Sequence, residues 1–276
     1  MRFPLFLFLA LCSSWCCSAA VTADKKDSVQ PIQMYTYKVV KKYRHDKSSF
    51  TQGLECNMDT NCDTFFESTG LYNGLSHIME VKKATGKRVK SKKLDNRFFG
   101  EGATVIGNRI YQLTWREKTI FSYAKGTLKE IRRAKWKSSN TEGWGLTNDG
   151  HNLIVSDGTA TLRWVCPKTL NELKAVEVRL PDGRPVNMLN ELEWIKGEIW
   201  ANVWFSDNIY IINPETGNVR GIVDMSGIYK PKNDSQDVLN GIAYDPVKKE
   251  IFVTGKMWPW LYKITVVEKH VAKDEV

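Results

Sequence analysis

A short signature of one polar, one small and one apolar residue recurs along this chain of 276 residues and constrains its fold more than any other feature. The copies lie 47 residues apart on average, which is the span from Gln52 to Asn240 divided by four. Repeats of about 40 to 50 residues are typical of propeller blades or of arrays of helical hairpins. The five copies are Gln52-Gly53-Leu54, Glu101-Gly102-Ala103, Trp144-Gly145-Leu146, Asn190-Glu191-Leu192 and Asn240-Gly241-Ile242.

Local patterns after each signature favour strands over helices. Alternating, β-branched and aromatic residues fill segments such as 110–114, 198–203 and 250–254. Turn residues such as Asn148-Asp149-Gly150 separate these segments, and no helical apolar stripe persists for more than about two turns. We therefore predict an all-β fold, a five-bladed β-propeller with four-stranded blades. A β-helix or a β-sandwich is the alternative.

The first twenty residues have the pattern of a secretory signal peptide. Arg2 is followed by an apolar stretch and by a small-residue cleavage site at Ser18-Ala19-Ala20, and a second cleavage site follows Ala23. An uncleaved membrane anchor is the alternative, but the stretch is shorter than the roughly 20 residues of a spanning helix. We expect a signal peptide (1–20), an N-terminal segment (21–36), a propeller domain (37–266) and a tail (267–276).

The predicted location is the secretory pathway, with the product either secreted or held in the lumen of the endoplasmic reticulum. The terminal Lys273-Asp274-Glu275-Val276 is similar to a retrieval signal whose last residue has been replaced. Asn233 heads the one glycosylation sequon of the chain. Both features are weak signals when taken alone.

Three cysteines remain after the predicted leader is removed, which excludes a disulfide scaffold. Cys56 and Cys62 flank a short polar loop, and in an oxidising compartment they are able to form a local disulfide. Cys166 is then left without a partner, and we expect it to be buried.

Composition excludes several classes of protein. With 42% hydrophobic and 26% charged residues, the chain is neither disordered nor collagen-like nor a coiled coil. Its net charge of +9 is spread over the chain, so we expect no nucleic-acid partner. The basic stretch 82–93 is interpreted as a solvated hairpin. The four histidines stand singly without ligand spacing, so we predict no zinc site and no cofactor.

In a propeller, equivalent positions of the blades meet around one channel. The first residues of the five signatures would therefore form a ring of Gln52, Glu101, Trp144, Asn190 and Asn240, with Asn240 placed there by the repeat alone. A second repeated position, at the end of the next strand, adds Trp115, Trp204 and Lys256. One carboxylate among amides and indoles is more typical of a binding site than of a packed plug. Five other tryptophans are interpreted as core: Trp136, Trp164, Trp194, Trp200 and Trp258.

Nine motifs in order give the chain a resemblance to the plant-type glutaminyl cyclases. They extend from about Tyr37 to Ile264 and include Phe50-Thr51-Gln52-Gly53-Leu54, Phe99-Gly100-Glu101-Gly102, Leu113-Thr114-Trp115, Glu142-Gly143-Trp144-Gly145-Leu146, Asn190-Glu191-Leu192-Glu193, Ala201-Asn202-Val203-Trp204 and Thr254-Gly255-Lys256. The resemblance implies a five-bladed propeller that converts the N-terminal glutamine of peptides or proteins to pyroglutamate, with release of ammonia. We also expect a metal-independent enzyme that acts as a monomer without stable membrane insertion.

The resemblance assigns roles to individual residues. Glu101 is the predicted catalytic proton shuttle, because one carboxyl group can take a proton from the substrate amine and return it to the leaving nitrogen. The predicted oxyanion donor is an amide of Gln52 or Asn190, an indole N–H or Lys256. The substrate pocket would consist of Phe50, Gln52, Phe99, Trp115, Trp144, Asn190, Trp204 and Lys256.

Other interpretations of the same residues stay open. Glu101 is also suited to a structural role, in which it caps the backbone of its own turn. The three pocket tryptophans are also suited to packing between blades. Lys256 is also interpretable as a solvated residue of a loop. A propeller that binds peptides or glycans without catalysis is the main alternative function. A calcium-dependent hydrolase is a third hypothesis, for which the candidate ligands are Asp157, Glu191, Glu193 and Asp224.

Overall fold

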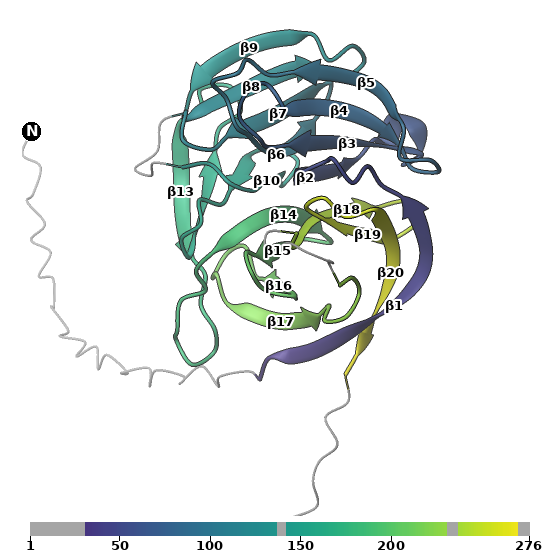
Figure 1. Ribbon diagram of the computed structural model, residues 1–276. Coiled ribbons are helices and arrows are strands. Elements are labelled where there is room, and N and C mark those ends of the chain that lie inside the picture. The colour runs from purple at the N-terminus through teal and green to yellow at the C-terminus, as the bar shows by residue number, and fades with distance from the viewer. Residues whose placement is uncertain (1–30, 137–141, 231–236, 270–276) are drawn as a thin grey trace, which may run out of the picture.

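The computed structural model describes residues 31–136, 142–230 and 237–269 (Figure 1). Over these ranges the chain forms twenty β-strands and one short 3-10 helix, Met58–Thr60, so the fold is all-β as predicted. No helix within these ranges has the length and apolar character needed to cross a membrane.

Twelve of these strands form three antiparallel sheets of four strands each, and each sheet is built in chain order. The first sheet comprises β2 (Thr51–Cys56), β3 (Thr64–Thr69), β4 (His77–Lys82) and β5 (Arg88–Lys93). The second comprises β6 (Gly100–Ile106), β7 (Arg109–Thr114), β8 (Thr119–Ala124) and β9 (Glu130–Lys135). The third comprises β10 (Leu146–Asn148), β11 (Leu153–Val155), β12 (Thr161–Val165) and β13 (Glu172–Glu177).

The other eight strands form one continuous sheet that consists of two four-stranded units. One unit is β14 (Leu189–Ile195), β15 (Glu198–Val203), β16 (Asn208–Ile212) and β17 (Val219–Asp224). The other contains β18 (Leu239–Asp245), β19 (Glu250–Gly255), β20 (Trp260–Glu268) and, as its outermost strand, β1 (Gln33–Arg44). A short parallel pairing of β1 with β17 joins the two units.

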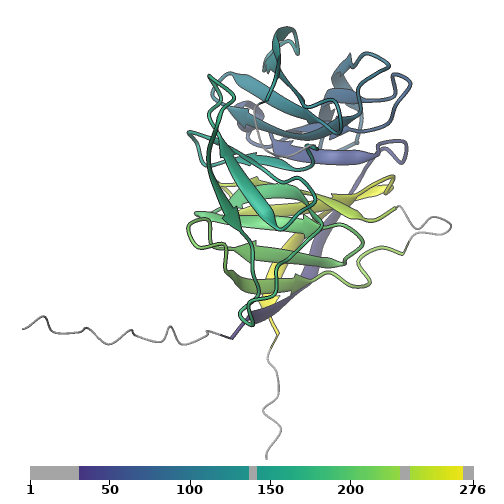
Figure 2. The same cartoon turned by 90° about the vertical axis from the view of Figure 1, so that its left-hand side faces the viewer.

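The N-terminal strand therefore completes the C-terminal unit. β1 pairs antiparallel with β20 from Tyr35 opposite Glu268 to Arg44 opposite Trp260, and the purple and yellow strands run together in Figure 2. These two strands extend a few residues beyond the expected limits of the domain at residues 37 and 266.

The first strands of the four-stranded units lie at the centre of the molecule, and the last strands lie at the periphery (Figure 1). β2 contacts β6, β6 contacts β10, β10 contacts β14, β14 contacts β18, and β18 returns to β2. The inner strands therefore close into a ring. This propeller-like arrangement agrees with the predicted strand count for each unit.

The small residue of the repeated signature is explained by contact between backbones in this ring. A Cβ atom on Gly145 would lie 1.8 Å from the carbonyl oxygen of Asn190, and one on Gly102 would lie 2.3 Å from the amide nitrogen of Leu146. Only glycine allows the backbones of neighbouring inner strands to approach this closely. The repeat is thus the sequence signature of ring closure.

Glu191 occupies the small position in the fourth copy, and its carboxylate bridges two other inner strands. It accepts hydrogen bonds from the backbone N–H groups of Leu54 at 3.3 Å and Ile242 at 2.8 Å. A buried carboxylate that accepts two backbone donors stabilises the ring where a glycine contact is absent.

Hydrophobic clusters fill the spaces between adjacent sheets. One cluster joins Leu54 and Phe65 of the first sheet to Phe252 and Leu261 of the last unit, so it seals the contact between the two ends of the ring. Of the five tryptophans predicted to be core residues, four are buried and Trp194 is partly buried against a cluster. The outer strand β5 is exposed along its whole length.

The cysteines partly match expectation. Cys56 and Cys62 form the predicted disulfide, with a sulfur–sulfur distance of 2.03 Å. Cys166 is free, but the expectation that it is buried was wrong, because it lies in a half-exposed turn after β12. The predicted leader, the Asn233 sequon and the tail from residue 270 lie outside the described residues.

Backbone contact at Gly145 leads to a first prediction. Gly145→Ala should lower the free energy of unfolding by about 3 kcal/mol or more, because the added methyl group meets a neighbouring backbone oxygen that cannot move aside. The measurement is urea denaturation followed by circular dichroism. Gly126→Ala is the control, because its added Cβ has open space around it, and it should change stability by less than about 1 kcal/mol. Equal effects of the two substitutions would contradict this account of the repeat.

Candidate active site

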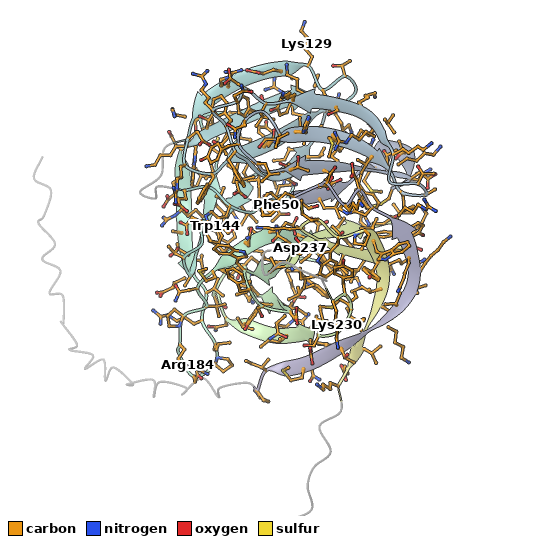
Figure 3. All side chains as sticks on the ribbon, in the orientation of Figure 1. Phe50, Lys129, Trp144, Arg184, Lys230 and Asp237 are labelled. Carbon is orange, nitrogen blue, oxygen red and sulfur yellow. A yellow bond between two sulfur atoms is a disulfide. The ribbon has the colours of Figure 1, made fainter. Side chains whose placement is uncertain are left out.

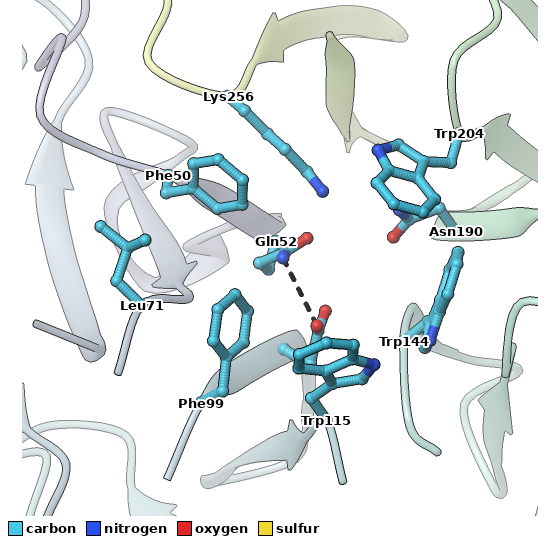
Figure 4. A pocket seen from close by; sticks show the side chains of 10 residues that line it. Phe50, Gln52, Leu71, Phe99, Trp115, Trp144, Asn190, Trp204 and Lys256 are labelled. Atoms are coloured by element: carbon cyan, nitrogen blue, oxygen red, sulfur yellow. Dashed lines mark hydrogen bonds between the residues drawn. The ribbon is translucent and has the colours of Figure 1, made fainter. Parts of the chain in front are cut away.

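A pocket of about 260 Å³ opens where the inner strands begin (Figure 4). Figure 3 places two of its residues, Phe50 and Trp144, near the middle of the molecule. All nine residues that the sequence analysis assigned to a site line this pocket, and Leu71 is the one lining residue that it missed. The lining consists of Phe50, Gln52, Leu71, Phe99, Glu101, Trp115, Trp144, Asn190, Trp204 and Lys256.

A repeated backbone hydrogen bond brings the two repeated positions together. Trp115 follows β7, and its N–H donates to the carbonyl of Phe99, two residues before Glu101, at 3.0 Å. The N–H of Lys256 likewise donates to Val238, two residues before Asn240, at 2.9 Å. In these units the residue after the second strand is thereby held beside the first residue of the signature. Because of this bond, side chains from the two repeated positions point into the same pocket.

Glu101 is the central acidic group of the pocket and is only 4% exposed. Its Oε1 accepts a hydrogen bond of 3.4 Å from Nε2 of Gln52, whereas its buried Oε2 has no partner among the described residues. Burial raises the pKa of Glu101 well above the ordinary value for a glutamate, and the positive charge of Lys256 opposes this rise. A carboxyl group with one unused oxygen and a raised pKa is suited to exchange protons with a ligand.

Asn240 orients the Gln52 amide that faces Glu101. Its Nδ2 donates to Oε1 of Gln52 at 3.2 Å and to the backbone oxygen of Thr51 at 2.9 Å. Because the Gln52 oxygen is thus occupied, its Nε2 is directed toward Glu101. Asn240 itself does not line the pocket. It contributes to the pocket indirectly, through its hydrogen bond to Gln52.

Lys256 extends into the pocket between Phe50 and Trp204 (Figure 4). Its side chain is buried, with Nζ 4.9 Å from the ring centroid of Phe50 and 5.6 Å from that of Trp204. Burial lowers the pKa of Lys256 to about 8, although the Glu101 carboxylate opposes this shift. The interpretation of Lys256 as a solvated loop residue was therefore wrong.

Glu142 is a polar residue near the pocket that the sequence analysis missed. Its Oε2 accepts the indole N–H of Trp115 at 2.8 Å and that of Trp144 at 2.9 Å. Arg116 donates to the other oxygen at 3.3 Å and stacks on the Trp115 ring. One carboxylate thus fixes two of the three pocket indoles. The motif Glu142-Gly143-Trp144 contained the signal, but the sequence did not reveal where this carboxylate points.

Besides Oε2 of Glu101, two buried polar atoms of the pocket have no partner among the described residues and are free to meet a ligand. They are Nε1 of Trp204, a donor, and Oδ1 of Asn190, an acceptor. The Trp204 ring packs edge-on against Trp144 with centroids 5.4 Å apart, which holds its N–H in place. Since Glu142 occupies the other two indole donors, Trp204 is the pocket indole whose N–H remains available.

The carboxylates considered as calcium ligands do not converge. Asp157 pairs with Arg163, Glu193 accepts the backbone N–H of Tyr244, and Asp224 contacts Lys269. Within residues 31–136, 142–230 and 237–269, no group of three or more histidine, cysteine, aspartate or glutamate side chains is arranged to hold a metal ion.

Comparison with known proteins agrees with this geometry. The family model described as glutamine cyclotransferase matches residues 9–266. The chain belongs to the glutamine cyclotransferase family. It is 42% identical to the glutaminyl-peptide cyclotransferase of Arabidopsis thaliana over 264 residues, which is 94% of this chain and 79% of that protein.

A solved structure supports the same family. The crystal structure of Myxococcus xanthus glutaminyl cyclase superimposes with a TM-score of 0.79 at 33% sequence identity. The match covers 87% of this chain and the whole of the bacterial chain. The resemblance to glutaminyl cyclases found in the sequence is therefore confirmed.

The role of Glu142 in this cyclotransferase-family pocket leads to a second prediction. Glu142→Ala should lower the free energy of unfolding by about 1–3 kcal/mol and change the near-ultraviolet circular dichroism, because two indole donors lose their acceptor. Glu142→Gln should recover most of both signals, since its amide oxygen can still accept. Glu130→Ala, which removes a surface glutamate paired with Arg133, is the control. A spectrum of Glu142→Ala identical to wild type would refute the proposed anchoring.

Proposed function

We propose that this chain is a glutaminyl-peptide cyclotransferase that converts the N-terminal glutamine of peptides or proteins to pyroglutamate and releases ammonia. The observation that carries this proposal is a single buried carboxyl group with an unused oxygen, Glu101, facing a buried lysine across an aromatic pocket. The names of the Arabidopsis and Myxococcus proteins support the same activity.

The size of the pocket fits one terminal residue. Pockets for drug-sized ligands occupy about 300–1,000 Å³, and this pocket is smaller at about 260 Å³. A glutamine side chain enclosed by Phe50, Trp144 and Trp204 has little freedom to extend. Because the nucleophile and the electrophile belong to the same residue, confinement of that residue in its folded-back conformer supplies much of the catalysis.

Proton transfer is the remaining requirement. The α-amine nitrogen attacks the γ-carbonyl carbon and gives up one proton, which the Glu101 carboxylate accepts through Oε2. The bond between that carbon and the amide nitrogen then breaks, and Glu101 returns the proton to the departing nitrogen, which leaves as ammonia. The carboxylate is restored, so the step balances without another reactant. Because burial raises the pKa of Glu101, its carboxylate is a stronger base than that of an ordinary glutamate, which suits it to accept the proton of the amine.

Negative charge develops on the γ-oxygen as the ring closes. Nε1 of Trp204 is an unpartnered donor, and the ammonium group of Lys256 adds positive charge at the same side of the pocket. Oδ1 of Asn190 is an acceptor suited to the substrate N–H groups. We assign oxyanion stabilisation to Trp204 and Lys256, because Glu142 occupies the other two indoles.

The magnitudes available from these groups are adequate. A positioned acid–base group contributes about 10²- to 10⁴-fold, and an oxyanion donor about 10²- to 10³-fold. Together they lower the barrier by about 5 to 9 kcal/mol at about 1.4 kcal/mol per factor of ten. This suffices for an intramolecular reaction that forms a five-membered ring.

We further propose that the five four-stranded units are the blades of a five-bladed β-propeller. The closed ring of contacts among β2, β6, β10, β14 and β18 supports this count. That the chain acts as a monomer stays a prediction. The disulfide supports passage through the oxidising secretory pathway, either to secretion or to retention in the endoplasmic reticulum.

The role of Glu101 leads to a third prediction. Glu101→Gln should lower kcat for a Gln-initiated dipeptide by about 10²- to 10⁴-fold and leave dipeptide binding within a few-fold of wild type, because the amide keeps the shape but cannot carry the proton. Ammonia release measures turnover, and calorimetry measures binding. Glu215→Gln, which alters an exposed turn, is the control and should keep full activity.

The same assay distinguishes the alternative functions. Normal turnover in Glu101→Gln would remove Glu101 from the mechanism. Peptide or glycan binding by a wild-type chain that releases no ammonia would favour the non-catalytic propeller. Activity that disappears with chelator and returns with calcium would favour the metal-dependent hydrolase, whereas the proposed chemistry predicts unchanged activity in chelator.

Lys256 gives a fourth prediction, which concerns pH. The α-amine of a free peptide has a pKa of about 7.7–8, so kcat/KM should rise toward pH 8 as this amine loses its proton. Above that pH it should fall, because Lys256, whose pKa is lowered to about 8, loses its positive charge. Lys256→Arg should remove the alkaline decrease, since the guanidinium stays charged. An unchanged alkaline limb in Lys256→Arg would exclude Lys256 as its origin.

A further inference from the structure

A second depression, unrelated to the pocket around Glu101, lies between the end of β1 and the β4–β5 turn. We call it the basic groove; it has a volume of about 540 Å³ and shares no lining residue with the first pocket. Its lining consists of Lys41, Lys42, Tyr43, Arg44, Ala84, Thr85, Lys87 and Trp260. A Cβ atom on Gly86 would lie 2.5 Å from the carbonyl oxygen of Arg44, so the turn and the strand are in direct contact. Figure 1 shows the two segments together at the right-hand side.

Four cationic side chains line the basic groove, and no acidic side chain does. Lys41, Lys42, Arg44 and Lys87 are all exposed, and none has an ion pair with the described part of the chain. Nearby basic groups are already neutralised, since Arg88 pairs with Asp46 at 3.1 Å. Unpaired like charges around a concavity repel one another, and an anionic ligand would relieve this repulsion.

Positive charge continues beyond the groove along the outer strand β5. Lys90 pairs with Glu80 at 3.1 Å, but Lys92 and Lys93 on the same exposed strand have no ion pair within the described residues. The basic stretch interpreted as a solvated hairpin therefore borders the groove. The charges of β1 and of the β4–β5 turn are more than 40 residues apart in sequence and become one surface only after folding, which explains why the sequence showed a diffuse excess.

Two aromatic rings distinguish the groove from a simple basic patch. Trp260 is 38% exposed, and Tyr43 lies below Lys41, whose Nζ is 5.1 Å from the ring centroid. Tyr43 is partly buried against Phe252, so Trp260 is the ring that faces solvent. An exposed ring beside cations offers a flat apolar surface on which the C–H face of a sugar can pack while its carboxylates meet the ammonium groups. A lipid bilayer presents a broad, flat surface, which does not match the concave shape of the groove.

We propose that the basic groove binds an anionic polysaccharide that carries carboxylates on its sugar rings. The disulfide places the folded chain in an oxidising compartment, where acidic glycans are available and nucleic acids are uncommon. Several charges along one strand and one turn suit a repeating polymer better than a single anion. This site would hold the protein on an acidic matrix while the pocket stays open.

The fifth prediction tests this site with the full chain and a fluorescent oligogalacturonate at low ionic strength. Lys42→Gln/Lys87→Gln should weaken binding about ten- to thirtyfold, because each lysine near an anionic surface contributes about 1 kcal/mol. Binding by wild type should weaken as salt is added. Ammonia release from a Gln-initiated dipeptide should not change, which separates failure of this proposal from failure of the enzymatic one.

Matched variants distinguish binding at the basic groove from attraction by the net charge of the protein. Lys129→Gln/Lys168→Gln removes two charges from the corresponding turns of the next two sheets, and Figure 3 shows Lys129 at the far rim. It should weaken binding less than about threefold. Trp260→Leu should weaken binding of oligogalacturonate but leave that of poly-glutamate unchanged, since only the sugar uses the ring.

The proposal fails if the two double variants lose equal affinity, because binding would then reflect net charge. It fails equally if single-stranded DNA, poly-glutamate or phosphatidylserine vesicles bind wild type more tightly than oligogalacturonate does. Thermal unfolding and dipeptide turnover of every variant establish that the fold is intact, so a loss of binding is attributable to the groove.

Discussion

Close contact between the backbones of the inner strands is the constraint on which the rest of the structure depends. Gly145 and Gly102 allow the backbones of neighbouring inner strands to come into direct contact. Glu191 bridges two inner strands through hydrogen bonds where its own signature has no glycine. The first residue of each signature is consequently directed to a common centre. A looser ring would separate Gln52 from Glu101 and admit water between them.

The same closure creates the electrostatic conditions of the pocket. Glu101 and Lys256 are both buried, and burial shifts their pKa values toward each other by opposing the charged form of each. Holding a carboxyl oxygen without a partner costs stability, which the surrounding packing and the hydrogen bonds of Gln52 and Asn240 offset. The pocket therefore holds two ionisable groups in an environment that disfavours their charged forms, as expected for a site that exchanges protons.

Much of the fold and the pocket was predictable from the sequence, because the repeat arises from the requirement that the inner strands approach one another closely around a ring. The position of each residue within its repeat predicted that Glu101, Asn190 and Lys256 lie together, since equivalent positions of the repeats meet around one centre. Glu142 escaped prediction because its function depends on where its side chain points, which the sequence does not reveal. The basic groove escaped because Lys42 and Lys87 belong to different sheets, and their meeting depends on how β1 completes the last unit.

β1 is the first strand of the described chain, yet it pairs with β20, the last one. The final unit thus cannot assemble from residues that are adjacent in sequence, and its completion joins segments more than 200 residues apart, as in the pairing of Arg44 with Trp260. Contacts of such long range form slowly. During synthesis, the earlier sheets are able to form before β20 exists, and until then β1 exposes an edge that has no antiparallel partner. The nascent chain therefore carries this incompletely paired strand until β20 has been synthesised, and this interval is when a chaperone would be most needed.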